Sequence, residues 1–393
     1  MVPAIDRDYL VQTLTDLVRI NSVNPTLVPG GAGEAEIADY VARSLGRMGL
    51  EVKTIEPEPR RPSIVGILDG GGPGRSLMLN AHYDTVGVEG MAEPFSGALR
   101  DGRLYGRGAY DMKGSLAACM AAVKALADTG ALASGRAVIA AVADEEYGSL
   151  GTAAVLRELK TDAAIVTEPT ALKVCLAHKG YLWIEVETLG RAAHGSRFTE
   201  GVDANMRMGR FLAALDRLER DLRARPPHPL VGPPSLHAAM LSGGTGLSTY
   251  AASCRLQIER RTVPGETESR AVGEIQEIMS RLSAADSSFH AAVRPFFARE
   301  PFEVAPDAAI VQVVDRAAAA VLGRSAPHFG DTPWMDSALL AAAGIETVII
   351  GPDGAGAHAA EEWVDVESVV QLARILVQAA LDYCRGCAPV SPG

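Results

Sequence analysis

Four short apolar runs in this sequence are each followed by an acidic residue or a histidine. The runs span residues 77–79, 137–142, 163–166 and 348–350. The polar residues beyond them are His82, Asp84, Glu145, Glu146, Glu168 and His358. Short apolar runs bounded by turn signals are typical of buried strands. Because functional side chains gather beyond the carboxyl ends of strands in α/β sheets, the pattern predicts one shared site.

Helical segments alternate with these apolar runs. Apolar residues recur near the helical period in residues 8–20 and 34–48. The Ala-rich segment 113–127 is apolar on nearly all sides, which is typical of a buried helix. Strands that alternate with helices predict an α/β sandwich around a mostly parallel sheet.

A different pattern fills the middle of the chain. Residues 253–261 alternate between polar and apolar, as in a half-exposed antiparallel strand. Helical stretches at 204–222 and 268–282 lie between strands of this kind. The resulting order, β-α-β-β-α-β, predicts an inserted α+β domain of the ferredoxin-like type.

These patterns predict two domains. We expect a discontinuous catalytic domain made of residues 1–181 and 298–393. The inserted domain is expected at residues 182–297. A chain of 393 residues is long enough for both.

The composition limits the partners and the location that we expect. The formal net charge of −11 argues against a nucleic acid or an anionic membrane as a partner. Residues 1–9 lack the apolar core of a signal peptide, and no uncharged apolar run approaches the length of a membrane span. We therefore expect a cytoplasmic protein.

The five cysteines are an odd number at wide spacing, which fits a reducing compartment. Cys384 and Cys387 form a single C-x-x-C pair near the end of the sequence. Such a pair is compatible with redox or metal chemistry, and it is also typical of two incidental thiols. The role of Cys384 and Cys387 stays open at this point.

Histidines and carboxylates that gather at one edge of a sheet indicate a site for divalent metal ions. They belong to five motifs: His82-Tyr83-Asp84, Gly106-Arg107-Gly108 leading to Asp111-Met112-Lys113-Gly114, Asp144-Glu145-Glu146, Glu168-Pro169-Thr170, and Gly351-Pro352 leading to His358. These motifs resemble those of the M20 metallopeptidase family over nearly the whole chain. That family includes acetylornithine deacetylases, succinyl-diaminopimelate desuccinylases, aminoacylases and glutamate carboxypeptidases.

The resemblance implies a site with two metal ions and five ligands. Asp111 would bridge the ions, His82 and Glu168 would complete one site, and Glu146 and His358 would complete the other. Histidine and carboxylate ligands suit Zn²⁺, and Co²⁺ or Mn²⁺ are alternatives. A hydroxide that bridges the metals would attack the substrate carbonyl.

Two further residues are expected to support this chemistry. Asp84 would hold the imidazole of His82 by its other ring nitrogen. Glu145 would act as general base and acid, taking a proton from the water and passing it to the leaving amine. The alternative for Glu145 is that it caps the helix that follows.

The resemblance also implies residues that contact the substrate. His194 would stabilise the oxyanion, and in dimeric relatives the matching histidine reaches the site of the partner subunit. Arg261 would bind a substrate carboxylate, with its neighbour Arg260 as the alternative. Gly244 and Gly356 would bring backbone groups to the substrate, although Gly244 also fits a plain hairpin turn.

The chain departs from the family pattern at two places. Residues 248–251 read Ser-Thr-Tyr-Ala where many relatives have Asn, any residue, an aliphatic residue and Pro. Met335 stands where relatives often have Thr. Asp336, which follows it, is expected to cap a short helix and to support the site.

Together these observations predict a hydrolase that cleaves the amide bond of an N-acyl amino acid or a similar small amide with a free carboxylate. A dipeptidase or carboxypeptidase with the same metal centre is one alternative. A non-catalytic metal-binding protein on the same fold is another. The resemblance further implies a homodimer formed through the inserted domain.

Overall fold

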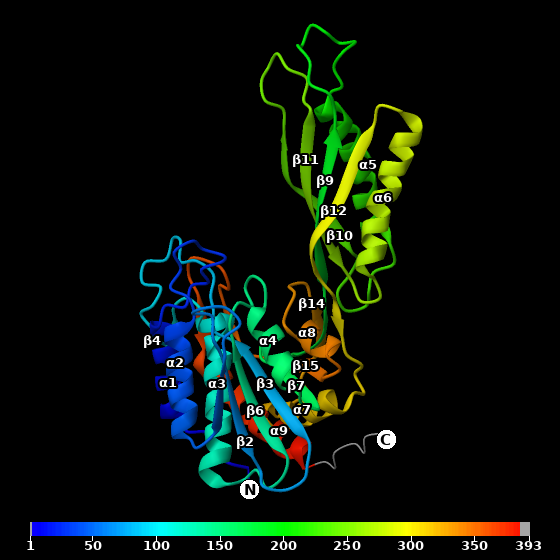
Figure 1. The fold of residues 1–393 in the computed structure, drawn as a ribbon. Coiled ribbons are helices and arrows are strands. Elements are labelled where there is room, and N and C mark those ends of the chain that lie inside the picture. The colour runs from blue at the N-terminus through cyan, green and yellow to red at the C-terminus, as the bar shows by residue number, and fades with distance from the viewer. Residues whose placement is uncertain (1, 386–393) are drawn as a thin grey trace. The chain divides into compact units, whose positions relative to one another are not determined.

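The computed structural model describes residues 2–385 and divides into two compact units (Figure 1). Unit 1 comprises the described residues up to 176, then 304–329, and those from 335 onward. Unit 2 comprises residues 177–303 and 330–334. No helix among residues 2–385 is long and apolar enough to cross a membrane.

The main sheet of unit 1 has a parallel centre. Its four central strands, in spatial order, are β6 (Arg136–Val142), β3 (Ser76–His82), β7 (Ala163–Val166) and β15 (Glu346–Ile349). Nearly every residue of these strands is buried. Continuous apolar runs are expected there, because helices cover both faces of a parallel sheet.

Antiparallel strands flank this centre. They are β2 (Ser63–Asp69) and β1 (Glu51–Ile55) beyond β6, and β8 (Val174–His178) beyond β15. Further pairs with β8 are made by β13 (Phe302–Glu303), which is antiparallel to it, and by β14 (His328–Asp331). The predicted α/β fold is confirmed, and parallel pairing is confined to the centre of the sheet. The sequence could not predict where parallel pairing ends, because a buried apolar run looks the same in a parallel and an antiparallel pair.

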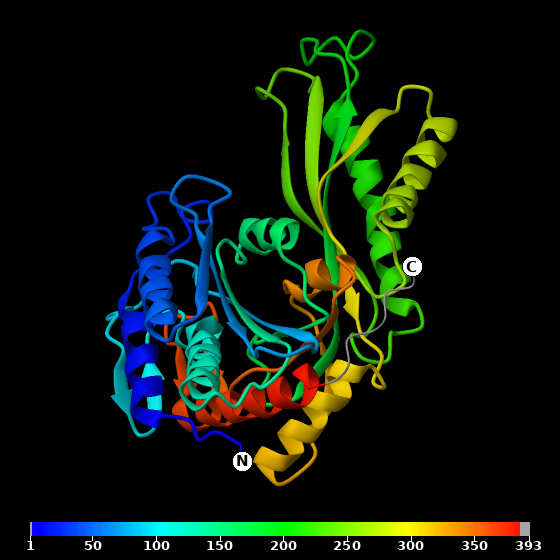
Figure 2. The ribbon, with the colours of Figure 1, turned by 60° about the horizontal axis from the view of Figure 1, so that its bottom comes forward.

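Helices cover both faces of the sheet (Figure 2). One face carries α3 (Gly114–Thr129), α7 (Ala309–Leu322) and α9 (Val366–Cys384), and the other carries α4 (Leu150–Glu158) and α8 (Ser337–Ala342). Helix α1 (Arg7–Arg19) packs on α3, and α2 (Ala35–Arg47) packs on β1 and β2. The Ala-rich α3 is buried along most of its length, as predicted, and it packs closely on α9.

A small antiparallel sheet completes unit 1. It contains β4 (Ala98–Arg100), β5 (Arg103–Tyr105), β17 (Trp363–Asp365) and β16 (Gly354–Ala355). The turn η1 (Ala109–Lys113) follows β5 and leads into α3. This small sheet therefore joins two segments that are far apart in the sequence.

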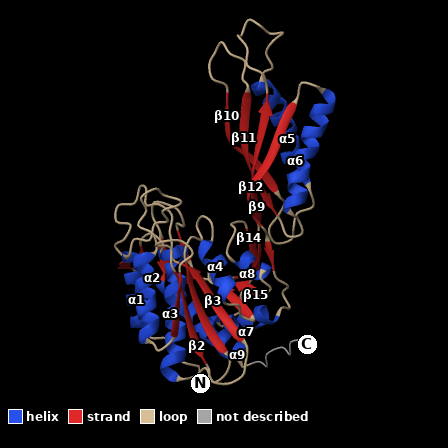
Figure 3. Cartoon of the chain, viewed as in Figure 1, coloured by secondary structure: helices blue, strands red, loops and turns tan. Residues whose placement is uncertain are grey.

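Unit 2 has the predicted order β-α-β-β-α-β (Figure 3). Its elements are β9 (Gly180–Leu189), α5 (Ala204–Ala224), β10 (Ser235–Gly243), β11 (Ser253–Thr262), α6 (Glu268–Ala285) and β12 (His290–Arg299). The antiparallel sheet runs β10-β11-β9-β12, so β10 and β12 are its edge strands. The apolar face of β9 and β11 packs with α5 and α6 in one hydrophobic core.

Candidate metal and catalytic site

The predicted site residues of unit 1 lie beyond the ends of the central strands. His82 is the last residue of β3, and Glu145 and Glu146 follow β6. Glu168 follows β7, and His358 lies beyond β15. Because parallel strands end at the same edge of the sheet, these side chains are brought together from distant parts of the sequence.

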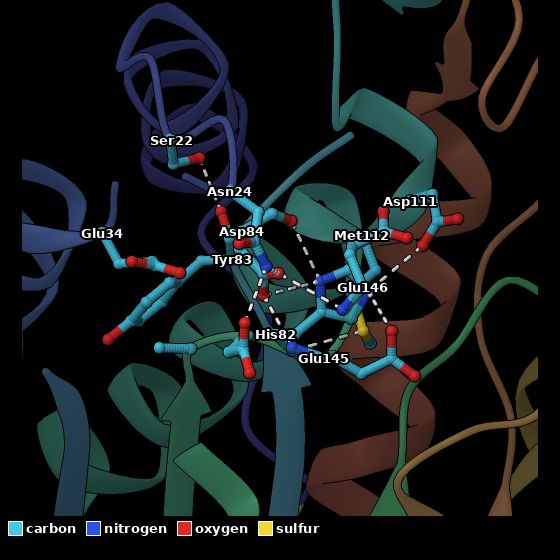
Figure 4. A network of polar contacts seen from close by, with 12 residues as sticks. Ser22, Asn24, Glu34, His82, Tyr83, Asp84, Asp111, Met112, Glu145 and Glu146 are labelled. Atoms are coloured by element: carbon cyan, nitrogen blue, oxygen red, sulfur yellow. Dashed lines mark hydrogen bonds and ion pairs between the residues drawn. The ribbon is translucent and has the colours of Figure 1, made fainter. Parts of the chain in front are cut away.

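His82 points the Nε2 edge of its ring into this group (Figure 4). Its Nδ1 lies 3.1 Å from the backbone carbonyl oxygen of Asp84. Its Nε2 lies 3.2 Å from Oδ1 of Asp111, 3.6 Å from Oε1 of Glu168 and 3.9 Å from Oε2 of Glu145. A proton on Nδ1 that is donated to the carbonyl leaves Nε2 free to act as a ligand.

Asp111 lies between the two histidines. Its Oδ1 faces His82, and its Oδ2 lies 3.4 Å from Nε2 of His358. The same nitrogen of His358 lies 3.0 Å from Oε2 of Glu146. Asp111 therefore offers one oxygen to each half of the group, as a bridging ligand must.

The charges of the group fit a divalent cation. Burial, followed by the carboxylate of Glu168, raises the pKa of Glu145 well above its ordinary value. Burial and the nearby Asp111 raise the pKa of Glu146 to about 7. Contacts with Asp111 and Glu146 raise the pKa of His358 to about 10. Negative charges that are crowded and buried in this way are stabilised by a bound metal ion.

Possible ligand atoms lie close enough together in two combinations. One is His82, Glu145 and Glu168, and the other is His82, Asp111 and Glu146, with all ligand atoms of each within 4.8 Å of one another. Such a set of imidazoles and carboxylates is compatible with Zn²⁺, Co²⁺ or Mn²⁺.

The carboxylate of Asp84 holds the main chain of the acidic pair. It accepts hydrogen bonds from the backbone nitrogens of Glu145 at 3.0 Å and Glu146 at 3.2 Å. Its distance to Nδ1 of His82 is 3.6 Å, which is longer than a hydrogen bond. Asp84 therefore contacts the other ring nitrogen of His82, as expected, but it does so through its backbone carbonyl oxygen and not through its carboxylate.

A buried ionic network that the sequence reasoning missed continues from Asp84. Asn24 donates its side-chain amide to Asp84 at 2.8 Å and to Asp144 at 3.0 Å. Arg61 donates to Asp144 at 2.7 Å and to both oxygens of Glu34 at 2.6 and 2.7 Å. All five residues are buried. No local sequence pattern predicts that Asn24, Glu34 or Arg61 is buried. Each is a polar residue in a loop or at the start of a helix, where the sequence predicts exposure to solvent.

Neither Glu145 nor Asp336 caps a helix through its side chain. Ser149, and not Glu145, occupies the N-cap position of α4. Asp336 occupies the N-cap position of α8, but its side chain makes no capping hydrogen bond. Instead, Asp336 accepts a hydrogen bond from the hydroxyl of Thr152, which is in α4.

Gly356 shapes the turn that leads to His358. Its φ is +86°, and an added Cβ would lie 1.8 Å from the carbonyl oxygen of Glu361. His358 itself has a φ of +62°, which is uncommon for a residue other than Gly. Gly356 is therefore needed for the backbone of this turn, whatever its contact with substrate.

The other predicted substrate residues belong to unit 2. His194 is exposed in the loop after β9, with Nδ1 2.8 Å from the hydroxyl of Ser196. Arg261 is half-buried at the end of β11, where its Nε donates to Glu259 and its guanidinium lies 5.0 Å from the ring centre of Tyr181.

The structure also places Arg260, the alternative to Arg261, and Gly244, for which a plain hairpin turn was the alternative. Arg260 is buried and forms ion pairs with Glu266 and Glu274, so it is already committed within unit 2. Gly244 is exposed beyond the end of β10 with a φ of +84°. Its position fits a hairpin turn as well as a substrate contact.

Of the C-x-x-C pair, Cys384 is buried, and its thiol donates to the carbonyl oxygen of Arg136 at 3.3 Å. Cys387 lies outside the described residues.

An α/β sheet with histidines and carboxylates gathered at the ends of its parallel strands is typical of the class of metal-dependent hydrolases. The chain belongs to peptidase family M20/M25/M40, whose family model matches residues 78–382. The resemblance noted in the motifs is thereby confirmed, and the chain is a metal-dependent amide hydrolase of that family.

Individual relatives cover nearly the whole chain. The acetylornithine deacetylase of Myxococcus xanthus is 30% identical over 95% of this chain and 97% of its own. The N-formyl-4-amino-5-aminomethyl-2-methylpyrimidine deformylase of Bacillus subtilis is 28% identical, with 96% and 95% covered. The YXEP protein of Bacillus subtilis, a dinuclear metal-binding peptidase from the M20 family, has a similar structure, with a TM-score of 0.74, 15% identity, and 96% and 98% covered.

Proposed function

We propose that this chain removes a short acyl group from the nitrogen of an amino acid or a similar small amide that carries a carboxylate. One observation carries the proposal. In the proposed assignment of five ligands, Glu145 is the carboxylate at the site that does not hold a metal ion, and its Oε2 lies 3.9 Å from Nε2 of His82. A hydrolase needs such a spare group to move protons.

The ligands divide naturally between two ions. His82, Glu168 and one oxygen of Asp111 would hold the first, and Glu146, His358 and the other oxygen of Asp111 would hold the second. We propose Zn²⁺, with Co²⁺ or Mn²⁺ as alternatives, since the donor set suits all three. Such ions polarise a carbonyl and lower the pKa of water.

The protein residues have separate parts in the reaction. Glu145 takes a proton from the attacking water and returns it to the leaving amine. Asp84 keeps Glu145 in place through its backbone nitrogen.

Substrate contacts are proposed for residues of unit 2 and for Gly356. Arg261 would bind the substrate carboxylate, because a guanidinium pairs with a carboxylate through two parallel hydrogen bonds. His194 would stabilise the oxyanion across a dimer, and Gly244 and Gly356 would offer backbone groups. In this proposal, residues 182–297 form the lid and dimerisation domain.

The edge strand β10 supports a homodimer. It pairs with β11 on one side only, and Met240 and Leu241 on it are 66% and 57% exposed. An exposed apolar edge strand is a site where another chain can pair. A cytoplasmic location is proposed as well, since Cys119, Cys254 and Cys384 form no disulfide among residues 2–385.

The acyl group is the part of the proposal that experiment must decide. The two relatives named above are a deacetylase and a deformylase. We therefore expect turnover of N-acetyl or N-formyl amino acids. The test measures amine release from N-acetyl, N-formyl and N-succinyl amino acids and from dipeptides, on metal-stripped protein with and without added Zn²⁺ or Co²⁺. Metal-dependent cleavage of dipeptides alone would favour the peptidase alternative, and metal binding without any turnover would favour the non-catalytic one.

A further inference from the structure

Glu362 is a buried carboxylate surrounded by the backbone of the segment that carries Asp111. One of its oxygens accepts hydrogen bonds from the backbone nitrogens of Tyr110 at 2.9 Å and Asp111 at 3.0 Å. The other accepts from the backbone nitrogen of Gly108 at 3.0 Å. Its side chain is 1% exposed. Three backbone nitrogens of one short segment are thus held by one side chain from a distant part of the sequence.

Arg107 connects the same carboxylate to the segment that carries His358. Its guanidinium donates to Glu362 at 2.7 Å and to the carbonyl oxygen of Ala359 at 2.9 Å. Arg107 is itself buried, so the pair is not screened by water. Its positive charge also offsets the cost of placing Glu362 near the carboxylate of Asp111.

The segments that carry Asp111 and His358 are also connected by the pairing of two strands. Strand β5 runs into the segment of Asp111, and β17 begins directly after Glu362. Trp363 of β17 pairs with Tyr105 of β5, and the backbone nitrogen of Gly106 donates to the carbonyl oxygen of Glu362 at 3.0 Å. The side-chain contacts of Glu362 therefore extend an existing pairing of strands up to the candidate metal site.

We propose that Glu362 is a positioning residue that sets the distance and orientation of Asp111 relative to His358. Asp111 must present one oxygen to each metal ion, so a small rotation of its backbone would separate it from one of them. Glu362 restrains that backbone at the nitrogen of Asp111 itself. The inference rests on the proposed ligand role of Asp111.

The chain contains a matched control for this proposal. Glu361 is exposed, whereas its neighbour Glu362 is buried. Glu362→Gln keeps the size of the side chain but replaces one acceptor oxygen with an NH₂ group that faces backbone donors. We expect faster hydrogen–deuterium exchange in a peptide covering residues 106–113 of the metal-free protein, by about tenfold or more. Glu361→Gln should exchange like the unaltered protein.

The second measurement is metal affinity. Residues that orient metal ligands typically change affinity by about 10- to 100-fold when they are replaced. We expect a loss of that size for Zn²⁺ in Glu362→Gln and no loss in Glu361→Gln. Glu362→Asp retains the charge that pairs with Arg107, so it keeps the fold, but it is too short to reach all three backbone donors and should show a smaller loss.

The two measurements separate this proposal from the one it rests on. Unchanged exchange in both Glu362 variants would overturn the positioning role. Faster exchange with unchanged Zn²⁺ affinity would also overturn it, since the restraint would then not act on the metal site. If Asp111→Asn binds two Zn²⁺ ions as tightly as the unaltered protein, the ligand role of Asp111 fails instead.

Discussion

Arg61 and Asp144 form an ion pair in the interior of unit 1, with Nη2 and Oδ1 2.7 Å apart and both side chains buried. Asp144 precedes Glu145 and has a φ of +67°, a conformation that costs energy in a residue other than Gly. The carbonyl oxygen of Asp144 accepts hydrogen bonds from the turn that follows, including one of 3.0 Å from Gly148. The ion pair therefore helps to hold the turn that carries the acidic pair.

Removing the charge of Arg61 should be costly. In Arg61→Met, the carboxylates of Glu34 and Asp144 lose their buried partner, and we expect unfolding free energy to fall by about 3–5 kcal/mol. Arg136→Met is the control, since Arg136 pairs with Asp69 at the surface and should contribute less than about 1 kcal/mol. Denaturant titration measures both, and equal losses would contradict the role of Arg61.

Glu145→Gln should separate proton transfer from metal binding. The amide keeps the volume of the side chain but cannot take a proton, so we expect kcat to fall by about 100- to 10,000-fold. Both metal ions should remain, as measured by elemental analysis. Glu158→Gln, on the exposed end of α4, serves as the control. Loss of a metal ion from Glu145→Gln would show that Glu145 is a ligand and that the base is another residue.

Metal binding should release protons. The pKa of His358 is raised to about 10 in the metal-free site, so this histidine is protonated at neutral pH. A ligand nitrogen must be neutral, and metal affinity should therefore rise as the pH increases from about 6 to 9. Calorimetric titration in buffers of different ionisation enthalpy measures the release. His358→Gln should release fewer protons, and equal release by both proteins would rule out His358 as the source.

Gly356→Ala should damage the turn before His358 by a clash and not only by backbone strain. Gly344 is the matched control, because its φ of +84° is nearly the same as the +86° of Gly356, yet an added Cβ meets nothing within 4 Å. Gly344→Ala should cost about 1–2 kcal/mol of stability from its conformation alone. Gly356→Ala should cost more and should also weaken metal binding. Similar results for both variants in thermal melting and Zn²⁺ titration would contradict the prediction, because the surrounding backbone would then have moved to remove the clash.

The proposed dimer can be tested at the edge of unit 2. A lysine at an edge strand disfavours pairing with another chain, so Leu241→Lys should raise the dissociation constant of the dimer by about tenfold or more. Leu99→Lys, at an exposed position in unit 1, is the control. Sedimentation velocity measures both variants. A monomeric protein with full activity would remove the basis for His194 acting across subunits.

Residues next to strand ends are the part of the site that sequence can predict. His82, Glu146 and Glu168 each follow a buried apolar run, so the fold brings them together once the runs pair in parallel. The alternation of β11 marks unit 2 in the same way. These features depend on local periodicity, which a single sequence contains.

Contacts between distant segments cannot be predicted in this way. Glu362 holds the backbone of Gly108, and Arg61 holds Asp144, but neither contact has a local signal. Asp84 is an intermediate case. Its spacing from His82 predicts proximity, but the turn between them decides that a carbonyl oxygen faces the ring. The antiparallel strands at the edges of the main sheet could not be predicted for a similar reason. A buried apolar run does not indicate whether the neighbouring strand is parallel or antiparallel to it.

The separation of Asp111 from Glu362 along the sequence has a consequence for biosynthesis. The segment that carries Asp111 leaves the ribosome before Glu362 has been made, so its restraint by this carboxylate does not yet exist. The proposed ligand His358 is likewise made after the other proposed ligands. The proposed set of ligands can therefore gather only after residue 362 has left the ribosome.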